Sequence, residues 1–196
     1  MSENNMSRKE RRENSDTRII AAAVKCFGQY GYSCSSLVMM AREAGVTGGL
    51  ISQRYDGKDM LFLTAYTEVM KVWHDVEETA SPRECLDSII AQIKAMYDTA
   101  PEAYAFCTML YRSMDYPRDI LQEPEQQLKQ RNIYRILERA QEAGYLPAGR
   151  LSVLLTAFIA TVFNHYSLCR RYDMPVPPNH HFYYGIHFGL FVHNSG

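Results

Sequence analysis

Apolar residues recur at intervals of three and four from residue 19 onward, which is the spacing of one face of an α-helix. Ser15, Asp16 and Thr17 stand just before this stretch and can cap its N-terminus. Gly31 follows it and suits the left-handed conformation in which many helices end. We therefore predict a first helix from about Thr17 to Gly31. Its buried positions are expected to be Ile19, Ile20, Ala22, Ala23, Cys26 and Phe27.

Two shorter helices are predicted next. Ser36 can cap the first, which Gly45 ends, and Thr47 can cap the second, which runs to about Tyr55. The apolar stripe of the first helix consists of Leu37, Met40, Ala41 and Ala44.

The rest of the chain also follows a helical pattern, with proline at several expected helix starts, where it is well tolerated. Lys58 is expected to open a long helix to about Thr79. Two helices should begin at Pro82 and Pro101. A loop or broken helix between Pro117 and Pro124 should lead into a helix that ends at Gly144. Another helix is expected from about Arg150 to Tyr172, and a last one should end near His193. No stretch alternates with a period of two, so the predicted fold is all-α with about nine helices.

Composition narrows the class of protein. With 196 residues, 46% of them hydrophobic, the chain can build a real core. Its polar N-terminus does not resemble a secretory signal, and no run reaches the roughly 18 apolar residues of a membrane span. Five scattered cysteines without a CxxC pair indicate free thiols in a reducing cytoplasm.

The net charge of −1 conceals two different halves. Residues 1–58 carry nine basic and six acidic side chains, a net charge of +3, whereas the remainder carries −4. We interpret residues 1–14 as a flexible arm, residues 15–58 as a nucleic-acid-binding domain and residues 59–196 as a second helical domain. The charged arm is either solvated or contacts DNA.

The two short helices fit a helix-turn-helix. Ala41 provides the small residue at the helix crossing, Gly45 the positive φ of the turn, and Val46 an apolar plug. With Ile51 and Tyr55 buried, the outward face of the third helix is expected to carry Gly48, Gly49, Ser52, Gln53 and Arg54.

This part of the chain resembles the DNA-binding domain of the TetR/AcrR family of transcriptional regulators. The resemblance covers about residues 15–61 in unbroken register and rests on Ile19 to Phe27, Gly31-Tyr32, Ser36, Met40-Ala41, Ala44 to Thr47, and Tyr55 to Leu61. It implies a helical ligand-binding and dimerisation domain after the DNA-binding domain, with the last two long helices forming a four-helix dimer interface.

The resemblance implies that Ser36, Thr47 and Lys58 contact the DNA backbone. Ser52, Gln53 and Arg54 are candidates for base contacts, since glutamine can read adenine and arginine guanine, although Arg54 could equally bind phosphate. Ser52 stands where tyrosine is commoner in the family. Gly48 and Gly49 either admit close approach of DNA or form a loosely specified turn, because glycine is costly within a helix.

The C-terminal half is expected to sense a ligand and dimerise. Its helices carry aromatic and methionine side chains that suit an adaptable apolar pocket, or are simply core. Candidate pocket residues are Met96, Tyr97, Tyr104, Cys107, Met109, Tyr111, Phe158, Asn164 and His165. Candidate dimer-interface residues are Leu155, Ile159, Phe163, Tyr184, Phe188 and Phe191.

We find no catalytic motif and predict no cofactor. The spacing of His180, His181, His187 and His193 is too loose to predict a metal site. The sequence favours a homodimeric repressor that binds an inverted-repeat operator in double-stranded DNA and responds to an apolar or aromatic effector. The alternative is a helical small-molecule-binding protein or enzyme without sequence-specific DNA binding.

Overall fold

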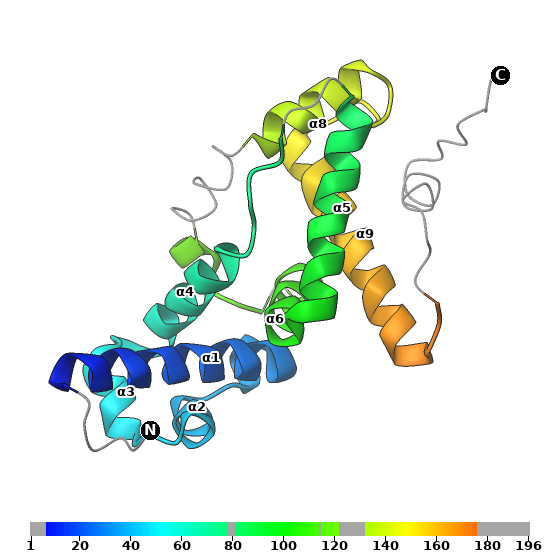
Figure 1. Ribbon diagram of the computed structural model, residues 1–196. Helices are drawn as coiled ribbons and strands as arrows, with labels where there is room; N and C mark the ends of the chain where they lie inside the picture. The colour runs from blue at the N-terminus through cyan, green and yellow to red at the C-terminus, as the bar shows by residue number, and fades with distance from the viewer. Residues whose placement is uncertain (1–6, 78–80, 114, 122–131, 176–196) are drawn as a thin grey trace. The chain divides into compact units, whose positions relative to one another are not determined.

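The computed structural model describes residues 7–77, 81–113, 115–121 and 132–175 (Figure 1). Within these ranges the ordered structure is helical, with eight α-helices, one 3-10 helix and no strand, which confirms the all-α prediction. The chain divides into two compact units. Unit 1 contains the residues up to Val72 and a second stretch that starts at Ala105, and unit 2 contains Trp73–Tyr104 and the residues after 122.

Unit 1 is built on a long helix, α1 (Arg8–Cys34). It contacts α2 (Leu37–Ala44) and α4 (Gly57–Met70), and α2 in turn contacts α3 (Gly48–Arg54). The apolar faces meet in a core that includes Ile19, Phe27, Met40, Ile51 and Phe62, all fully buried. These residues lie at the helical spacings that the sequence shows, because each helix must bury one apolar stripe.

Helix α6 (Pro101–Arg112) contributes its residues from Ala105 onward to unit 1. Phe106 lies against Phe62, with ring centroids 5.5 Å apart. The 3-10 helix η2 (Arg118–Leu121) contacts α4. Gly28 of α1 lies so close to α6 that a Cβ there would be 2.8 Å from the backbone nitrogen of Phe106. A glycine is therefore required at position 28 by the approach of another backbone.

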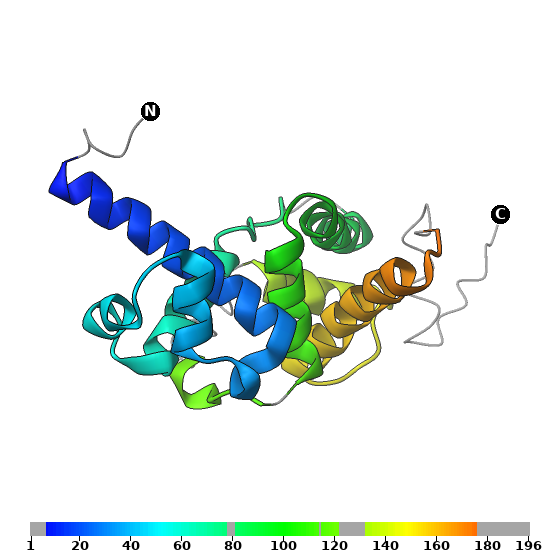
Figure 2. The same ribbon diagram turned by 90° about the horizontal axis from the view of Figure 1, so that it is seen from below.

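The start of α1 corrects the sequence prediction. The helix begins at Arg8, so residues 8–14, predicted to be a flexible arm, are helical. Ser7 and Glu10 form a capping box: the Ser7 backbone N–H donates to Glu10 Oε2 at 2.6 Å, and the Glu10 N–H donates to Ser7 Oγ at 3.2 Å. This pair satisfies N–H groups that a helix start otherwise leaves unpaired. The predicted break at Gly31 is present, since its φ of 80° and ψ of 173° are not helical, but helical turns continue beyond it to Cys34. Figure 2 shows α1 as the long helix drawn in blue.

Helix α4 also differs, since it ends at Met70 and not near Thr79. The segment that follows belongs to unit 2, where side-chain amides replace the helical hydrogen bonds. Gln92 accepts from the His74 N–H at 3.0 Å and donates to the His74 carbonyl at 3.1 Å. Asn132 forms the same pair of bonds with the backbone of Val76. Polar partners from distant positions thus hold this segment out of the helix.

Unit 2 consists of α5 (Pro82–Thr99), α8 (Ile133–Glu142) and α9 (Leu151–Tyr172), each of which contacts the other two (Figure 1). The starts of α5, α6 and α9 and the end of α8 agree with the prediction. The last predicted helix, which carries Tyr184, Phe188 and Phe191, lies outside the described residues.

Helix α9 has 22 residues and by length and composition alone is apolar enough to cross a membrane. The core helix of a soluble protein can have the same length and composition, and α9 has a buried face of eight residues. Leu155, Ile159 and Phe163 lie on that buried face. The three side chains therefore pack within the chain and do not form the partner-facing surface predicted for them.

Candidate nucleic-acid interface

The α2–α3 pair forms the predicted helix-turn-helix. Ser36 caps α2 by accepting from the Met39 N–H at 3.2 Å, and Gly45 ends the helix with φ 63° and ψ 39°. The Val46 N–H then donates to the Ala41 carbonyl at 2.9 Å, which closes the turn. A residue with a side chain rarely adopts this left-handed conformation, so the local sequence alone places the turn.

The turn is also held from outside by Arg18 of α1, a functional residue that was not predicted. Its Nη2 donates to the carbonyls of Ala44 at 2.5 Å and Gly45 at 3.1 Å. A guanidinium suits the C-terminal end of a helix because the free carbonyls there carry partial negative charge. Its spacing of 26 residues from Ala44 leaves no local signal by which to find it.

Helix α3 presents an open face. Thr47 caps it by accepting from the Leu50 N–H at 3.3 Å, and Ile51 is buried beneath it. Gly49, Ser52 and Gln53 are exposed, as predicted, whereas Gly48 is half-buried. A Cβ built on Gly48 or Gly49 would meet nothing within 4 Å, and neither residue has a positive φ. Internal packing therefore does not require these glycines.

Arg54 does not point outward as predicted. Its side chain is only 16% exposed and reaches back to α1, where Nη1 lies 2.6 Å from Oδ1 of Asp16. The same nitrogen donates to Ser15 Oγ at 2.7 Å and to the Arg12 carbonyl at 3.2 Å. Arg54 is thus a bracket between α3 and α1, because three acceptors on α1 converge on its guanidinium.

Lys58 also has internal partners. Its Nζ donates to the carbonyls of Tyr32 at 2.9 Å and Ser35 at 3.1 Å, and it lies 4.1 Å from the centre of the Tyr32 ring. An ammonium group has three N–H donors, so one remains for a further acceptor. Lys58 therefore joins the end of α1 to the start of α4 and keeps capacity for one phosphate contact.

Two carboxylates complete this junction. The Tyr32 hydroxyl donates to Asp59 of α4, and Ser33 Oγ donates to Asp115 at 2.5 Å. Burial, followed by the neighbouring Asp59, raises the pKa of Tyr32 well above its ordinary value. The phenol therefore stays protonated and keeps donating at physiological pH.

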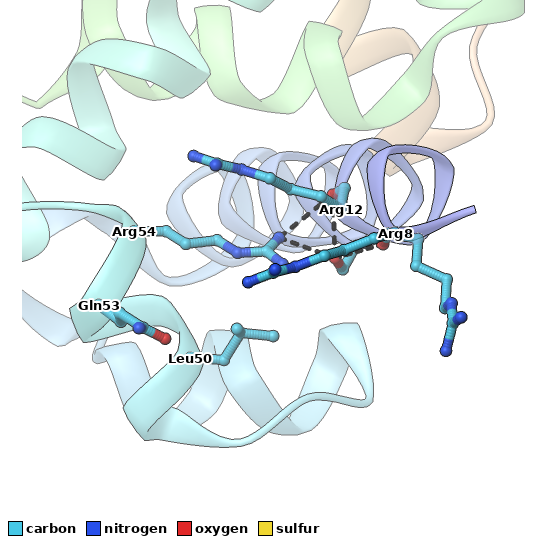
Figure 3. A pocket seen from close by; sticks show the side chains of 7 residues that line it. Arg8, Arg12, Leu50, Gln53 and Arg54 are labelled. Carbon is cyan, nitrogen blue, oxygen red and sulfur yellow. Dashed lines mark hydrogen bonds between the residues drawn. The ribbon is translucent and has the colours of Figure 1, made fainter. Parts of the chain in front are cut away.

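A hollow of about 750 Å³ lies between the N-terminal turns of α1 and the exposed side of α3. Figure 3 shows Arg8 and Arg12 of α1 bordering the same space as Leu50 and Gln53 of α3, with the Arg54 side chain spanning the two helices. We call this the arginine groove. Its lining residues are Arg8, Arg11, Arg12, Ser15, Leu50, Gln53 and Arg54.

The candidate ligand-pocket residues divide between the two units. Cys107, Met109 and Tyr111 belong to unit 1, and the other six belong to unit 2. In unit 2, Tyr97, Tyr104 and Phe163 form an aromatic cluster, in which the Tyr104 hydroxyl donates to the Phe163 carbonyl at 2.5 Å. Met96 and Phe158 are buried, while Asn164 and His165 are half-buried. The structure thus shows these aromatic side chains packed on one another, and their part in a pocket stays a prediction.

His180, His181, His187 and His193 lie outside the described residues. Over the described ranges, no three His, Cys, Asp or Glu side chains gather as metal ligands would. All five cysteines are free thiols, and only Cys34 is exposed.

Comparison with known proteins agrees with this geometry. The family described as bacterial regulatory proteins, tetR family, matches residues 19–65, which span most of α1 through the first half of α4. The chain is 28% identical over 134 residues to the HTH-type transcriptional regulator HbdR of Aromatoleum sp. (strain CIB). That match covers 66% of this chain and spans 58% of the length of HbdR.

Two solved structures share the fold. A TetR family transcription regulator from Marinobacter aquaeolei VT8 has a TM-score of 0.67 at 16% identity, over 90% of this chain and 93% of that one. The transcriptional regulator FadR from Bacillus subtilis, in complex with stearoyl-CoA, has a TM-score of 0.59 at 19% identity, over 82% and 90%. The helix-turn-helix in its expected register and these likenesses agree: residues 19–65 match the tetR family of bacterial regulatory proteins, and the chain shares the fold of solved TetR family regulators.

Proposed function

We propose that this protein is a DNA-binding transcriptional regulator whose helix α3 reads the major groove. The observation that carries the proposal is the exposed face of α3, which includes Ser52 and Gln53. Gly45 and Arg18 fix the turn before this helix, and Arg54 ties its end to α1. A recognition helix needs this combination, because base contacts discriminate only when the helix is fixed in one position.

Gln53 is the principal candidate for a base contact, since it is exposed and its amide can pair with both edge atoms of adenine. Gly48 and Gly49 allow a close approach of the DNA. Ser52, on the same helix, is shorter than the tyrosine that is commoner there in the family. Ser36, Thr47 and Lys58 are proposed to hold phosphates. Arg54 is now proposed to position α3, because its charge is already paired with Asp16.

Dimerisation is part of the proposal, since two copies related by a twofold axis would read an inverted repeat. Their recognition helices would enter major grooves roughly 34–36 Å apart. A repressor of this kind acts in the cytoplasm, and its effector would change that separation through a coupling of about 1–3 kcal/mol.

The effector is proposed to be an apolar or aromatic small molecule bound by the helices that follow the DNA-binding unit. The aromatic and methionine content of unit 2 supports this choice. Since the similar FadR of Bacillus subtilis was solved with stearoyl-CoA, fatty acyl thioesters are the first compounds to test.

Selection of bound duplexes from a random DNA pool tests the function. We expect enrichment of an inverted repeat, and a loss of about 1–3 kcal/mol of binding free energy on replacing Gln53 with alanine. Gln29→Ala is the matched control, because Gln29 is exposed on α1 and does not belong to the helix-turn-helix. Absence of any enriched sequence would instead favour a helical small-molecule-binding protein or enzyme.

A further inference from the structure

We propose that the arginine groove binds the sugar–phosphate backbone of duplex DNA beside the bases that α3 reads. This inference rests on the proposed function and extends it, since it assigns a second DNA-contacting element, the N-terminal turns of α1. The groove joins two helices that are distant in the sequence, and neither forms it alone.

The α1 side of the groove follows from helical spacing. Arg8 lies three and four residues before Arg11 and Arg12, and Ser15 lies four and three residues after them, so all four are on one side of the helix. Lys9, Glu10 and Glu13 are not among the residues that line the groove. Arginine is therefore concentrated on the side that α3 faces.

The charges of the groove do not cancel internally. Asp16 is paired closely with Arg54 at 2.6 Å and lies 3.9 Å from Arg12. The other two carboxylates of the helix start are used elsewhere: Glu10 caps the helix with Ser7, and Glu13 pairs with Lys9 at 3.8 Å. The groove consequently keeps a net positive charge, which favours an anionic partner.

The groove is also preorganised. The capping box makes the first turns of α1 helical, and the Arg54 bracket ties the following turns to α3. A basic segment that is already ordered loses less conformational entropy on binding than a flexible one. A phosphate strand would therefore meet arginines that are already arranged along one line.

The other wall of the groove indicates which anion fits. Leu50 and Gln53 belong to α3, and Gln53 is the proposed base reader (Figure 3). When α3 occupies a major groove, the strand that borders that groove must run past its edge. The arginine groove lies at that edge, so the sugar–phosphate backbone is the occupant that the geometry favours over an isolated small anion.

The test compares the salt dependence of DNA binding between variants of the full-length chain. The double variant Arg8→Gln/Arg12→Gln removes two charges from the groove and keeps the Arg12 backbone carbonyl that accepts from Arg54. The matched control is Lys9→Gln/Lys71→Gln, which removes two exposed charges that do not line the groove. Circular dichroism verifies that both remain helical and melt like the unmodified protein.

We expect the slope of log affinity against log salt to fall by roughly 0.9 for each phosphate that is no longer neutralised, and so by up to about 3.6 for a dimer. The decrease in affinity should be equal on the selected sequence and on unrelated duplexes, because backbone contacts carry no sequence information. The control should keep the slope of the unmodified protein.

Two outcomes overturn the inference. One is operator binding in which the groove variant and the control have the same slope. The other is a difference in slope between the groove variant and the control that disappears when inorganic phosphate replaces chloride at equal ionic strength. That result would show that the groove holds free phosphate. Failure of the proposed function is distinguishable from both, since the unmodified protein would then select no sequence.

Discussion

At the residue scale, Arg54 shows that a charged side chain on the second helix of a helix-turn-helix can stabilise the fold. Three acceptors on α1 receive its guanidinium, and only 16% of the side chain stays exposed. All three bonds are made by Nη1, so the end of the side chain is directed toward α1. Its contribution to DNA binding is therefore expected to be indirect.

Replacing Arg54 with alanine should lower the free energy of unfolding by about 1–3 kcal/mol, because hydrogen bonds to a charged group are removed from a partly buried site. Urea unfolding measures this change. Lys9→Ala is the control and should alter stability little, since Lys9 is 85% exposed. If the Arg54 variant kept its stability and lost binding to one DNA sequence while it still bound others, the arginine would be shown to read a base.

Glycines 45 and 49 should respond to alanine in opposite ways. At Gly45 a φ of 63° and the Arg18 guanidinium, 2.5 Å from the added Cβ, should cost about 1–2 kcal/mol of stability. At Gly49, where the Cβ meets nothing, alanine should stabilise the helix by up to about 1 kcal/mol. Thermal unfolding measures both. Weaker DNA binding by the more stable Gly49→Ala variant would support close approach of DNA there, and unchanged binding would contradict it.

At the element scale, the first turn of α1 should depend on pH. The backbone N–H and hydroxyl of Ser7 hold the pKa of Glu10 below its ordinary value of 4.5. A lowered carboxyl pKa means that the cap is intact above pH 4.5 and opens as the pH falls through the lower value. Hydrogen exchange of the Glu10 and Arg11 amides should report this opening.

The variant Glu10→Gln separates charge from capping, because glutamine also completes a capping box. Its first turn should stay protected without the acid transition. If the unmodified protein and this variant became unprotected at the same pH, the transition would belong to another group.

The contact between α1 and α6 provides a second prediction at this scale. Alanine at position 28 would place its Cβ 2.8 Å from the Phe106 nitrogen and 3.0 Å from the Ala105 carbonyl carbon. Backbone atoms cannot move aside cheaply, so we expect a decrease of about 1–3 kcal/mol in the free energy of urea unfolding. Gly149→Ala, whose Cβ would lie 3.9 Å from Cγ of Leu154, should leave stability nearly unchanged. If Gly28→Ala were as stable as Gly149→Ala, α1 and α6 would be able to move apart at little cost.

At the scale of the whole molecule, the exposed side of α9 is where we expect a partner subunit. Val153, Leu168 and Tyr172 are 61%, 47% and 61% exposed on this helix. Leu168→Glu should weaken self-association on the order of tenfold or more, because a carboxylate would be buried in the interface. Sedimentation velocity measures the shift to monomer. Val72→Glu, an exposed site of unit 1, serves as control, and equal sedimentation of the two variants would place the interface elsewhere.

Prediction from the sequence succeeded where a signal is local. Ser36, Thr47 and Gly45 mark the helix ends that the structure shows, because capping and positive φ depend on neighbouring residues only. It failed for the start of α1 because a plausible cap at residues 15–17 concealed the earlier Ser7–Glu10 box. It failed for the end of α4 because Gln92 and Asn132 act from distant positions.

The sequence by itself determined that the chain is helical, where its helix-turn-helix lies, and that its register is that of the TetR family. These properties follow from periodicity, caps and turn residues within a few positions of one another. Only the tertiary structure decided which arginines hold the fold and which border the groove. Arg18 and Arg54 find their acceptors 26 to 42 residues away, and Arg8 and Arg12 share a groove with Gln53. Such partnerships depend on helix packing, which no local pattern encodes.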